Sequence, residues 1–209
     1  MKNKIAIIAN GSINDKEFHK KFLKDFDIVI CADGGANNAR ELDITPDYII
    51  GDLDSADSEV IDYFNNKKTE IINDDDQNKT DLELAIALAT TLDPSEIKIF
   101  GAIGNRIDHT LANIFCLTQI KPEIKAQIID EKNVISLVED SIDVIGKKDD
   151  LVSVVPLTDV FGLSYNGLKW NVSNKNTRMG WFGISNRLTN SKGKINLSKG
   201  KILVIKSKE

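Results

Sequence analysis

Two aspartates separated by one residue are the first feature of this sequence that points to chemistry. Asp52 and Asp54 stand in Gly51-Asp-Leu-Asp-Ser55, directly after the apolar residues 48–50. In extended backbone, residues two apart share a face, so both carboxylates are expected to point the same way, with Leu53 pointing into the protein. Mg²⁺ is commonly held by one or two carboxylates together with substrate phosphates. The pair therefore favours a magnesium–nucleotide site over a helix-capping turn, which does not require both aspartates.

A third aspartate, Asp81, lies at the start of the clearest predicted helix, residues 80–92, where Thr80 and Glu83 have the spacing of a capping box. Asp81 has two chemical roles open to it, completing a metal cluster or accepting the proton of an attacking hydroxyl. A purely structural role, stabilising the first turn through the helix dipole, is equally compatible with its position. The acidic residues 74–76 just before it are expected to be mainly a solvated loop.

Two further segments carry residue types that bind phosphate. Asp33-Gly-Gly35 leads from a predicted strand into a predicted helix, where paired glycines let backbone amides approach an anion, although a tight turn without a ligand explains the pair better on its own. Arg106 begins a later helix and is able to reach a phosphate. Asp108 adds a carboxylate there or caps the helix. Neither a dinucleotide-binding fingerprint nor a P-loop motif occurs.

The C-terminal part contains both tryptophans, Trp170 and Trp181, and the polar stretch Gly183-Ile-Ser-Asn186. An aromatic side chain beside Ser and Asn is suited to stack on a flat heterocycle and to attract it by a cation–π interaction if that ring is charged. A tryptophan in a sandwich core and an ordinary Ser-Asn turn explain the same residues without a ligand.

The elements that position these residues alternate along the first two-thirds of the chain. Short β-branched runs alternate with amphipathic stretches, which predicts an α/β, Rossmann-like domain with a mostly parallel sheet. In such a sheet ligands bind beyond the carboxyl ends of the strands, and Gly, a carboxylate or both follow each of the first five predicted strands. The expected strands are 5–9, 28–31, 48–50, 70–72, 97–100 and 126–129, and the expected helices are 15–25, 35–42, 57–66, 80–92 and 107–120.

From about residue 131 the helical periodicity disappears. Short alternating segments punctuated by glycines predict a smaller all-β, jelly-roll-like sandwich. We therefore expect two domains, 1–130 and 131–209, without a flexible linker between them. The expected strands of the second domain are 134–138, 142–145, 151–155, 160–165, 168–172, 194–197 and 201–206.

Composition narrows the class of protein further. A net charge of −5 over 209 residues argues against a nucleic-acid-binding surface, because phosphate backbones select basic patches. No window of about 18 apolar residues exists, so no membrane span is expected, and the N-terminus runs directly into a strand, so we expect a cytoplasmic protein. Cys31 and Cys116 stand in apolar runs without metal-ligand spacing and are expected to be small buried residues.

Four ordered motifs of this chain resemble those of the thiamine pyrophosphokinase family. The resemblance implies an α/β catalytic, ATP-binding domain followed by a β-sandwich that binds thiamine and forms a homodimer. It also implies Mg²⁺- and ATP-dependent transfer of pyrophosphate to the hydroxyethyl oxygen of thiamine, which yields thiamine diphosphate and AMP. The motifs are Ala32-Asp-Gly-Gly-Ala36, residues 46–55, 79–85 and 101–113, with a looser match at 183–186 followed by 200–205.

The resemblance also implies roles for individual residues. Asp52, Asp54 and Asp81 would surround the magnesium and the phosphates, and Arg106 and Asp108 would lie in the same catalytic cleft. Nucleotide contacts are expected from Gly11, Asp33, Gly34, Gly35, Ser55, Lys79 and Thr80. Thiamine is expected near the dimer interface, with contacts from Gln77 of one chain and Trp181, Ser185 and Asn186 of the other.

The sequence departs from the family at one position near the metal. The family usually has an acidic residue three positions before the residue that matches Asp81, and this chain has Asn78 there. An amide is able to coordinate Mg²⁺ but brings no charge, and Asp76 is a candidate to compensate. For the reaction itself, Asp81 is our candidate general base for the thiamine hydroxyl, which must attack the β-phosphorus of ATP.

Two other functions compete with this interpretation. One is a Mg–ATP phosphotransferase that acts on a different alcohol. The other is a non-catalytic sensor of nucleotide or thiamine diphosphate, whose expected sign is loss of the Asp52, Asp54 and Asp81 set. All three are present.

Overall fold

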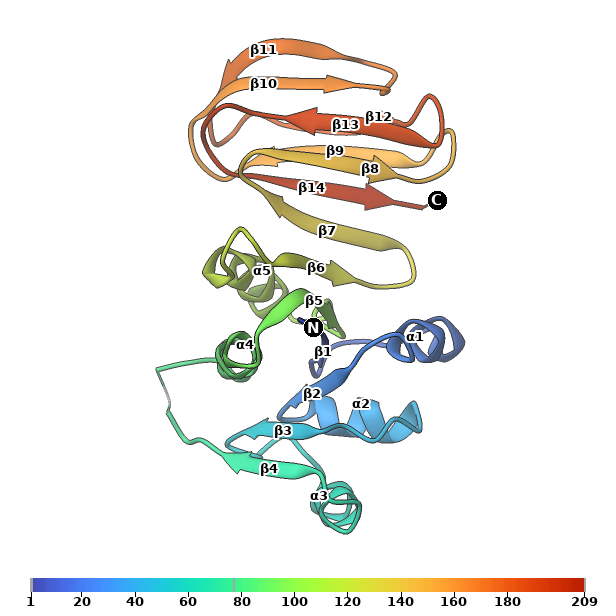
Figure 1. Cartoon of the computed structure of the whole chain (residues 1–209), viewed down its shortest axis with the longest axis vertical. Helices are drawn as coiled ribbons and strands as arrows, with labels where there is room; N and C mark the ends of the chain where they lie inside the picture. Colours follow the sequence, from blue (N-terminus) through green and yellow to red (C-terminus); the bar gives the residue numbers. More distant parts are fainter. Residues whose placement is uncertain (1, 77, 209) are drawn as a thin grey trace. The chain divides into compact units, whose positions relative to one another are not determined.

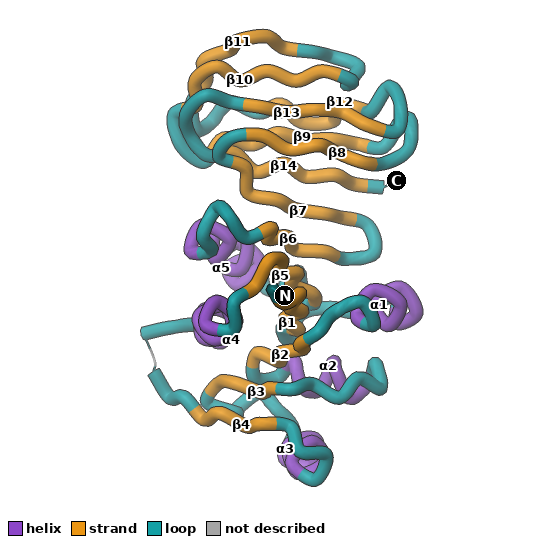
Figure 2. Tube along the Cα trace, in the orientation of Figure 1, coloured by secondary structure: helices purple, strands orange, loops and turns teal. Residues whose placement is uncertain are grey.

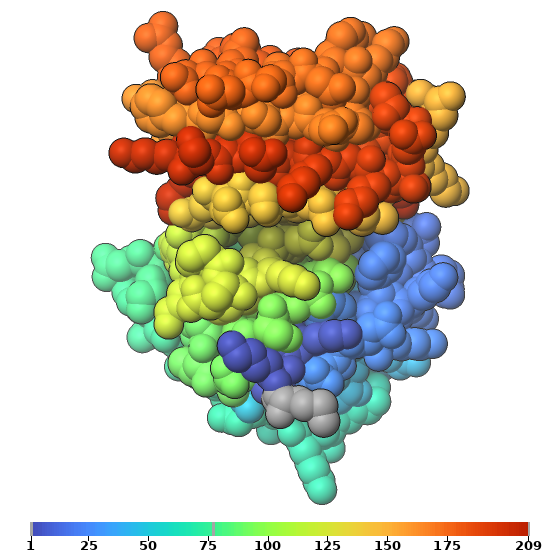
Figure 3. All heavy atoms as spheres, turned by 45° about the horizontal axis from the view of Figure 1, so that its top comes forward, coloured from blue at the N-terminus to red at the C-terminus, as the bar shows by residue number. Residues whose placement is uncertain are grey.

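The chain divides into two compact units in a computed structural model that describes residues 2–76 and 78–208. The first unit is Met1–Glu131 and the second is Lys132–Glu209. Figure 1 follows the chain through both units in sequence colours, and Figure 3 shows the same units as space-filling atoms. The order of elements confirms the predicted fold class, an α/β part followed by an all-β part.

The first unit is built on a parallel sheet with the strand order β6-β5-β1-β2-β3-β4. The inner strands are buried as nearly continuous apolar runs, as a sheet covered on both faces requires. The order turns back at β1, which pairs with both β2 and β5. The strands are β1 Asn3–Ile8, β2 Ile28–Ala32, β3 Tyr48–Gly51, β4 Glu70–Asn73, β5 Pro94–Phe100 and β6 Lys125–Ile129.

Helices cover both faces of this sheet. Figures 1 and 2 show α1, α2 and α3 on one side and α4 and α5 on the other. This division follows from right-handed crossovers, because the strand order runs one way from β1 to β4 and the opposite way from β5 to β6. The helices are α1 Lys16–Leu23, α2 Gly35–Glu41, α3 Ser58–Asn65, α4 Asp81–Thr91 and α5 Ile107–Cys116, followed by the 3₁₀ turn η1 Leu117–Gln119.

The predicted capping box at the start of α4 is present. The Thr80 hydroxyl accepts the Glu83 N–H at 3.3 Å, and the Glu83 carboxylate accepts the Thr80 N–H at 2.9 Å. These reciprocal bonds satisfy two backbone donors that the first turn leaves without helical partners. They fix the point at which the helix begins, and therefore the place of Asp81 in its first turn.

The second unit is a sandwich of two antiparallel four-stranded sheets, with the orders β12-β9-β14-β7 and β11-β10-β13-β8. Alternate side chains along the strands, such as Val152 and Val154 on β9, point into an apolar core. The strands are β7 Asn133–Val138, β8 Ser141–Ile145, β9 Leu151–Pro156, β10 Val160–Asn166, β11 Val172–Thr177, β12 Gly183–Arg187, β13 Lys192–Asn196 and β14 Ile202–Ser207.

The sequence prediction was wrong at two strands of this unit. The expected strand 168–172 is mostly a turn, in which the Asn171 side chain accepts the Leu168 N–H at 3.3 Å, and the strand β11 begins only at Val172. The strand β12 was not predicted at all. Both β11 and β12 lie at sheet edges and pair with one neighbour each, so they carry polar, exposed residues and lack a strong apolar alternation.

Three other expectations concern the helices and the cysteines. The predicted helix 107–120 ends its α-helical part at Cys116 and continues only as the short 3₁₀ turn. Cys31 and Cys116 are both buried, as predicted, and neither forms a disulfide. None of the helices in the described part of the chain has the length and apolar character that a membrane crossing requires.

Candidate active site

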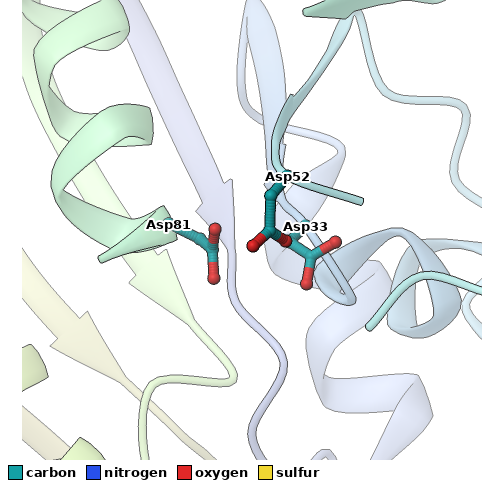
Figure 4. A group of neighbouring side chains, drawn as sticks. All are labelled: Asp33, Asp52 and Asp81. Carbon is teal, nitrogen blue, oxygen red and sulfur yellow. The ribbon is translucent and has the colours of Figure 1, made fainter. Parts of the chain in front are cut away.

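Three carboxylates meet at the carboxyl ends of β2 and β3 and at the start of α4. One carboxylate oxygen from each of Asp33, Asp52 and Asp81 lies within 4.8 Å of the other two. Figure 4 shows Asp33 and Asp52 side by side with Asp81 facing them from the first turn of α4. Asp33 is only 2% exposed, whereas the other two are partly exposed. Chain segments almost fifty residues apart thus place three negative charges in one small volume.

Backbone geometry brings these residues together. Asp33 follows β2 with a φ of 42°, its N–H donates to the Ile50 carbonyl at 2.9 Å, and its Oδ2 accepts the Ser55 N–H at 3.2 Å. Gly51 ends β3 with a φ of 151°, and a Cβ there would lie 2.8 Å from the Asp33 Cβ and 2.9 Å from Asp81 Oδ1. A glycine is therefore required at this position both for its backbone conformation and for the close approach of the carboxylates.

The segment after β3 does not continue as extended backbone, so that part of the sequence prediction was wrong. Leu53 has a φ of 64°, and the Asp54 N–H donates to Asp52 Oδ1 at 3.2 Å. Aspartate favours such a turn because its side chain bonds the backbone two residues further on. Asp54 is consequently exposed and outside the group of three, and its carboxylate accepts the Ser55 hydroxyl at 2.9 Å.

Partial burial and the neighbouring carboxylates raise the pKa of Asp81. The pKa of Asp81 is raised from its ordinary value of 3.8 to about 6, first by partial burial and then by the negative charges of Asp33, Asp52 and Asp54. Like charges this close destabilise the fully ionised state unless a cation or a proton is present. The electrostatics of the group therefore match a cation site better than a set of solvated surface acids.

A cavity of about 290 Å³ opens over this group. It brings together Asp52, Asp54, Ser55 and Asp81, which were predicted to share a site, although they come from two different loops. Lys79 supplies a fixed positive charge in the lining. The remaining lining residues are Asp74, Asp75, Asp76, Leu84 and His109.

The loop 74–76 was expected to be mainly solvated, but it lines this cavity. Asp76 accepts the backbone N–H and the side-chain amide of Asn78 at 3.1 and 2.9 Å, and it forms an ion pair with Lys79 at 3.4 Å. These bonds, led by those from Asn78, lower the pKa of Asp76. Asp76 is thus near the site but outside the group of three carboxylates. Gln77 lies outside the described residues.

Arg106 and Asp108 form a pair of their own. The guanidinium donates from Nε and Nη2 to the two oxygens of Asp108, at 3.2 and 2.6 Å, and both side chains are about two-thirds exposed. This pairing lowers the pKa of Asp108 to about 2. Arg106 occupies the N-cap position of α5, and Asp108 does not cap it. Neither residue lines the acidic cavity, whereas the adjacent His109 does.

Comparison with known proteins agrees with this geometry. A family model described as the catalytic domain of thiamin pyrophosphokinase matches residues 19–128, and a model for the vitamin B1 binding domain of the same enzyme matches residues 139–202. The chain belongs to the thiamin pyrophosphokinase family.

Two similar proteins illustrate the extent of the match. Thiamine pyrophosphokinase from Bacillus subtilis is 29% identical, with 97% of this chain and 98% of that protein covered, and its crystal structure superimposes with a TM-score of 0.87 over 99% of both chains. The crystal structure of thiamin pyrophosphokinase from Geobacillus thermodenitrificans gives a TM-score of 0.83 at 25% identity, over 98% of this chain and 97% of that one.

The glycines that were predicted to contact nucleotide have a packing role in this family member. A Cβ on Gly35 would lie 2.0 Å from the Ile8 carbonyl oxygen, so only glycine lets α2 start this close to β1. Gly34 packs against Asn10, and the Gly11 N–H donates to the Gly101 carbonyl at 2.6 Å. The glycines therefore bring the loops after β1, β2 and β5 together, which is compatible with a ligand role but does not require one.

Two functional candidates were missed in the sequence. Asn37 donates to the Ser55 carbonyl at 3.2 Å and accepts the Asp57 N–H at 3.1 Å, which ties α2 to the loop that carries Asp52 and Asp54. Asn38 donates to the carbonyls of Ala9 and Gly11, at 2.8 and 3.0 Å. The only sequence signal was their position directly after Gly34-Gly-Ala36, at the start of a helix where asparagine is otherwise unremarkable.

The three residues of the second unit that were predicted to contact thiamine differ in how exposed their side chains are. Ser185 is exposed and has a φ of 61°, a conformation that non-glycine residues adopt rarely. Asn186 is buried, and its side chain donates to the Trp170 carbonyl at 2.6 Å and accepts the Trp170 N–H at 3.0 Å. Trp181 packs against the sandwich core, with the Lys175 ammonium 5.0 Å from its ring centre. Ser185 is thus the most accessible of the three.

The second unit also contains a larger depression, of about 610 Å³. Phe161, Lys199 and Lys201 are among its lining residues, and none of the predicted site residues is. Lys201 is paired with Glu139 at 2.8 Å. Of these two cavities, the smaller, acidic one is the one lined by predicted site residues.

Proposed function

We propose that this protein is a thiamine pyrophosphokinase, which transfers the terminal diphosphate of ATP to the hydroxyl of thiamine and releases thiamine diphosphate and AMP. Family membership over both units supports this activity. The observation that carries it is the acidic cavity at the strand ends of the α/β unit, because phosphoryl-type transfer depends mainly on positioning and on neutralising charge.

The residues present fit Mg²⁺. All candidate donors are carboxylate oxygens, which this ion prefers, and Gly51 leaves room between them that a side chain would fill. Asp52 and Asp81 would hold it, and Asp54, which lies outside the group of three but lines the same cavity, would join them by turning its carboxylate toward the ion. When bound, Mg²⁺ supplies neutralisation of the negative charge on the transferred phosphate oxygens.

The chain's own residues supply the remaining functions. Asp81 is the candidate base for the thiamine hydroxyl, and a pKa near 6 suits a group that must accept a proton close to neutral pH. Arg106 is the candidate for binding phosphate. Its guanidinium is paired with Asp108, so binding requires either that this pair breaks or that the guanidinium donates to the phosphate and to Asp108 at once.

For ATP we propose contacts from the loops that carry Gly11, Asp33-Gly-Gly35 and Ser55, together with Lys79 and Thr80. Lys79 lines the acidic cavity, where its ammonium is able to bind an incoming phosphate. The Thr80 hydroxyl is already engaged with Glu83, so a contact with the nucleotide would require it to exchange or share one of these bonds.

For thiamine we propose contacts from Ser185, Trp181 and Asn186, with Gln77 from the other chain of a homodimer. The second unit exposes large apolar side chains near Ser185 in the sequence, including Met179 at 63%, Phe182 at 60% and Ile184 at 61%, which supports an interface there. A cationic thiazolium is also attracted by an acidic cavity. A cytoplasmic location stays a prediction.

The test is product formation by the purified protein with ATP and Mg²⁺, with and without thiamine. We expect thiamine-dependent AMP in a one-to-one ratio with thiamine diphosphate. Thiamine-dependent ADP would mean a monophosphate kinase, and activity only with other alcohols would mean a different phosphotransferase. Tight binding of both ligands without turnover would mean a sensor.

A further inference from the structure

The edge strand β12 contains a bulge near its centre. The register of β12 against β9 shifts between Gly183 and Asn186. Within that shift, Ile184 and Ser185 of β12 stand opposite the single residue Ser153 of β9. An extra residue of this kind leaves the regular ladder, bends the strand and redirects a side chain. The bulge therefore places Ser185 differently from a residue in a regular strand.

The bulge changes which side chains of β12 face solvent. In a regular strand Ile184 and Asn186 would share a face, because side chains alternate. Here Ile184 and Ser185 are both exposed, whereas Asn186 is buried. Ser185 has a φ of 61°, a left-handed conformation that costs free energy in a residue with a side chain. This conformation of Ser185 therefore needs a contact that compensates it.

Ser153 supplies such a contact. Its hydroxyl oxygen accepts the Ser185 N–H at 3.1 Å. Val152 and Val154 point into the sandwich core, so Ser153 between them points to the outer face of the same sheet. The hydroxyl there replaces the backbone acceptor that the bulge removes from the ladder. A residue without a hydroxyl at position 153 would leave the Ser185 N–H without this acceptor.

We propose that Ser153 is a positioning residue for thiamine: its hydroxyl holds the β12 bulge, and the bulge presents the Ser185 hydroxyl to the ligand. This inference rests on the proposed function, in which Ser185 contacts thiamine and Ser153 acts only through Ser185. The indole of Trp181 lies against the same strand, because a Cβ on Gly183 would lie 2.7 Å from one of its ring carbons. An aromatic ring and a fixed hydroxyl on one strand suit a flat, cationic heterocycle.

The test measures kcat and the KM values for thiamine and ATP in variants of the full chain. Ser153→Ala should raise the KM for thiamine about three- to tenfold, as loss of one neutral hydrogen bond does, with the KM for ATP unchanged and kcat within about twofold of wild type. A wild-type KM for thiamine in Ser153→Ala would overturn the proposal.

Two further substitutions at the same position separate the hydroxyl from the shape of the side chain. Ser153→Thr keeps the hydroxyl and should have the wild-type KM for thiamine. Ser153→Val has nearly the shape of threonine without the hydroxyl and should behave as Ser153→Ala does. Both are β-branched residues that suit a strand, so both are expected to fold. Equal KM values for thiamine in these two variants would refute the role of the hydroxyl.

Ser164 provides a matched control on the other sheet of the sandwich. Its hydroxyl oxygen accepts the Asn174 N–H at 2.8 Å, and Asn174 also has a left-handed φ, of 49°. Ser164→Ala thus removes the same kind of bond at a place where no thiamine contact is proposed, and it should leave the KM for thiamine unchanged. An equal rise in Ser153→Ala and Ser164→Ala would indicate a general loss of order in the sandwich and would overturn the proposal.

A double mutant tests whether Ser153 acts through Ser185. In a chain that already carries Ser185→Ala, adding Ser153→Ala should change the KM for thiamine by less than about twofold, because the hydroxyl that the bulge positions is then absent. If the effects of the two substitutions multiply in full, Ser153 acts independently of Ser185 and the proposal is wrong.

Calorimetric titration with thiamine separates failure of this inference from failure of the proposed function. If the wild type forms AMP with thiamine but Ser153→Ala binds thiamine equally well, the positioning role is wrong and the activity stands. If the wild type binds thiamine but forms no AMP, and Ser153→Ala binds it about three- to tenfold more weakly, the activity is wrong and the positioning role stands.

Discussion

Acidifying the metal-free protein from pH 8 to pH 5 should stabilise it through Asp81. The pKa of Asp81 is raised to about 6 in the folded chain, so folding favours its protonated form. The stabilising contribution is fully present below the unfolded pKa and is lost as the pH rises through the folded one. Burial and the neighbouring carboxylates therefore cost stability at neutral pH unless a cation is bound.

The size of this effect follows from the shift. An increase from 3.8 to about 6 corresponds to about 3 kcal/mol at most, since one pKa unit is about 1.4 kcal/mol. Asp81 is only half-buried, and solvent screening reduces such a figure, so about 1–1.5 kcal/mol is a better expectation. For a chain of this size that corresponds to a change of about 3–6 °C in Tm.

The assay is thermal unfolding in EDTA at pH 5 and pH 8, for wild type and Asp81→Asn. Other carboxylates change the Tm of both proteins with pH, so the measured quantity is the Tm of the variant minus that of the wild type. This difference should increase by about 3–6 °C from pH 5 to pH 8. Asp62→Asn, in α3 and outside the cluster, is the control for removal of a charge. A difference that does not change with pH for Asp81→Asn would refute the electrostatic argument.

Three further predictions concern individual side chains. Asp54→Asn should fold normally and lower turnover by about a hundredfold or more, as loss of an electrostatic catalytic group does, and near-wild-type kinetics would remove Asp54 from the site. Ser185→Ala should raise the KM for thiamine more than the KM for ATP, because Ser185 is the accessible polar candidate in the second unit; the reverse pattern would move thiamine elsewhere. Asn37→Ala breaks both bonds to the loop 52–57 and should cost about 1–3 kcal/mol in denaturant unfolding. The Mg²⁺ concentration that gives half-maximal activity should also be higher for Asn37→Ala than for the wild type. An unchanged concentration would show that Asn37 does not position the acidic residues.

Local sequence signals were sufficient to predict a helix or strand where a single strong residue preference, such as a capping box or a β-branched run, determined it. The capping box of Thr80 and Glu83 marked the start of α4, and continuous β-branched runs marked β1, β2 and β5. The edge strands β11 and β12 were missed because exposed, polar residues at a sheet edge carry no periodic apolar signal, and their pairing with β10 and β9 is long-range.

The residues around Asp52 were not placed correctly by local sequence patterns. The spacing of Asp52 and Asp54 predicted an extended pair, yet Leu53 adopts a left-handed conformation that moves Asp54 out of the group. Asp33 was predicted as a nucleotide contact, and the structure places its carboxylate beside Asp52 and Asp81. Nothing in the sequence around Asp33 gives its distance from Asp81, because that distance depends on how β2, β3 and α4 pack.

The sequence by itself determined the α/β and all-β halves, the start of the helix that carries Asp81, and the acidic character of the strand ends. These depend on hydrophobic periodicity, capping and residue type, which act over a few neighbouring residues. Only the tertiary structure decided which carboxylates converge, because the strand order brings the ends of β2 and β3 together and the glycine at position 51 opens the space between Asp33 and Asp81. Contacts between residues almost fifty positions apart are a property of packing, and no local preference encodes them.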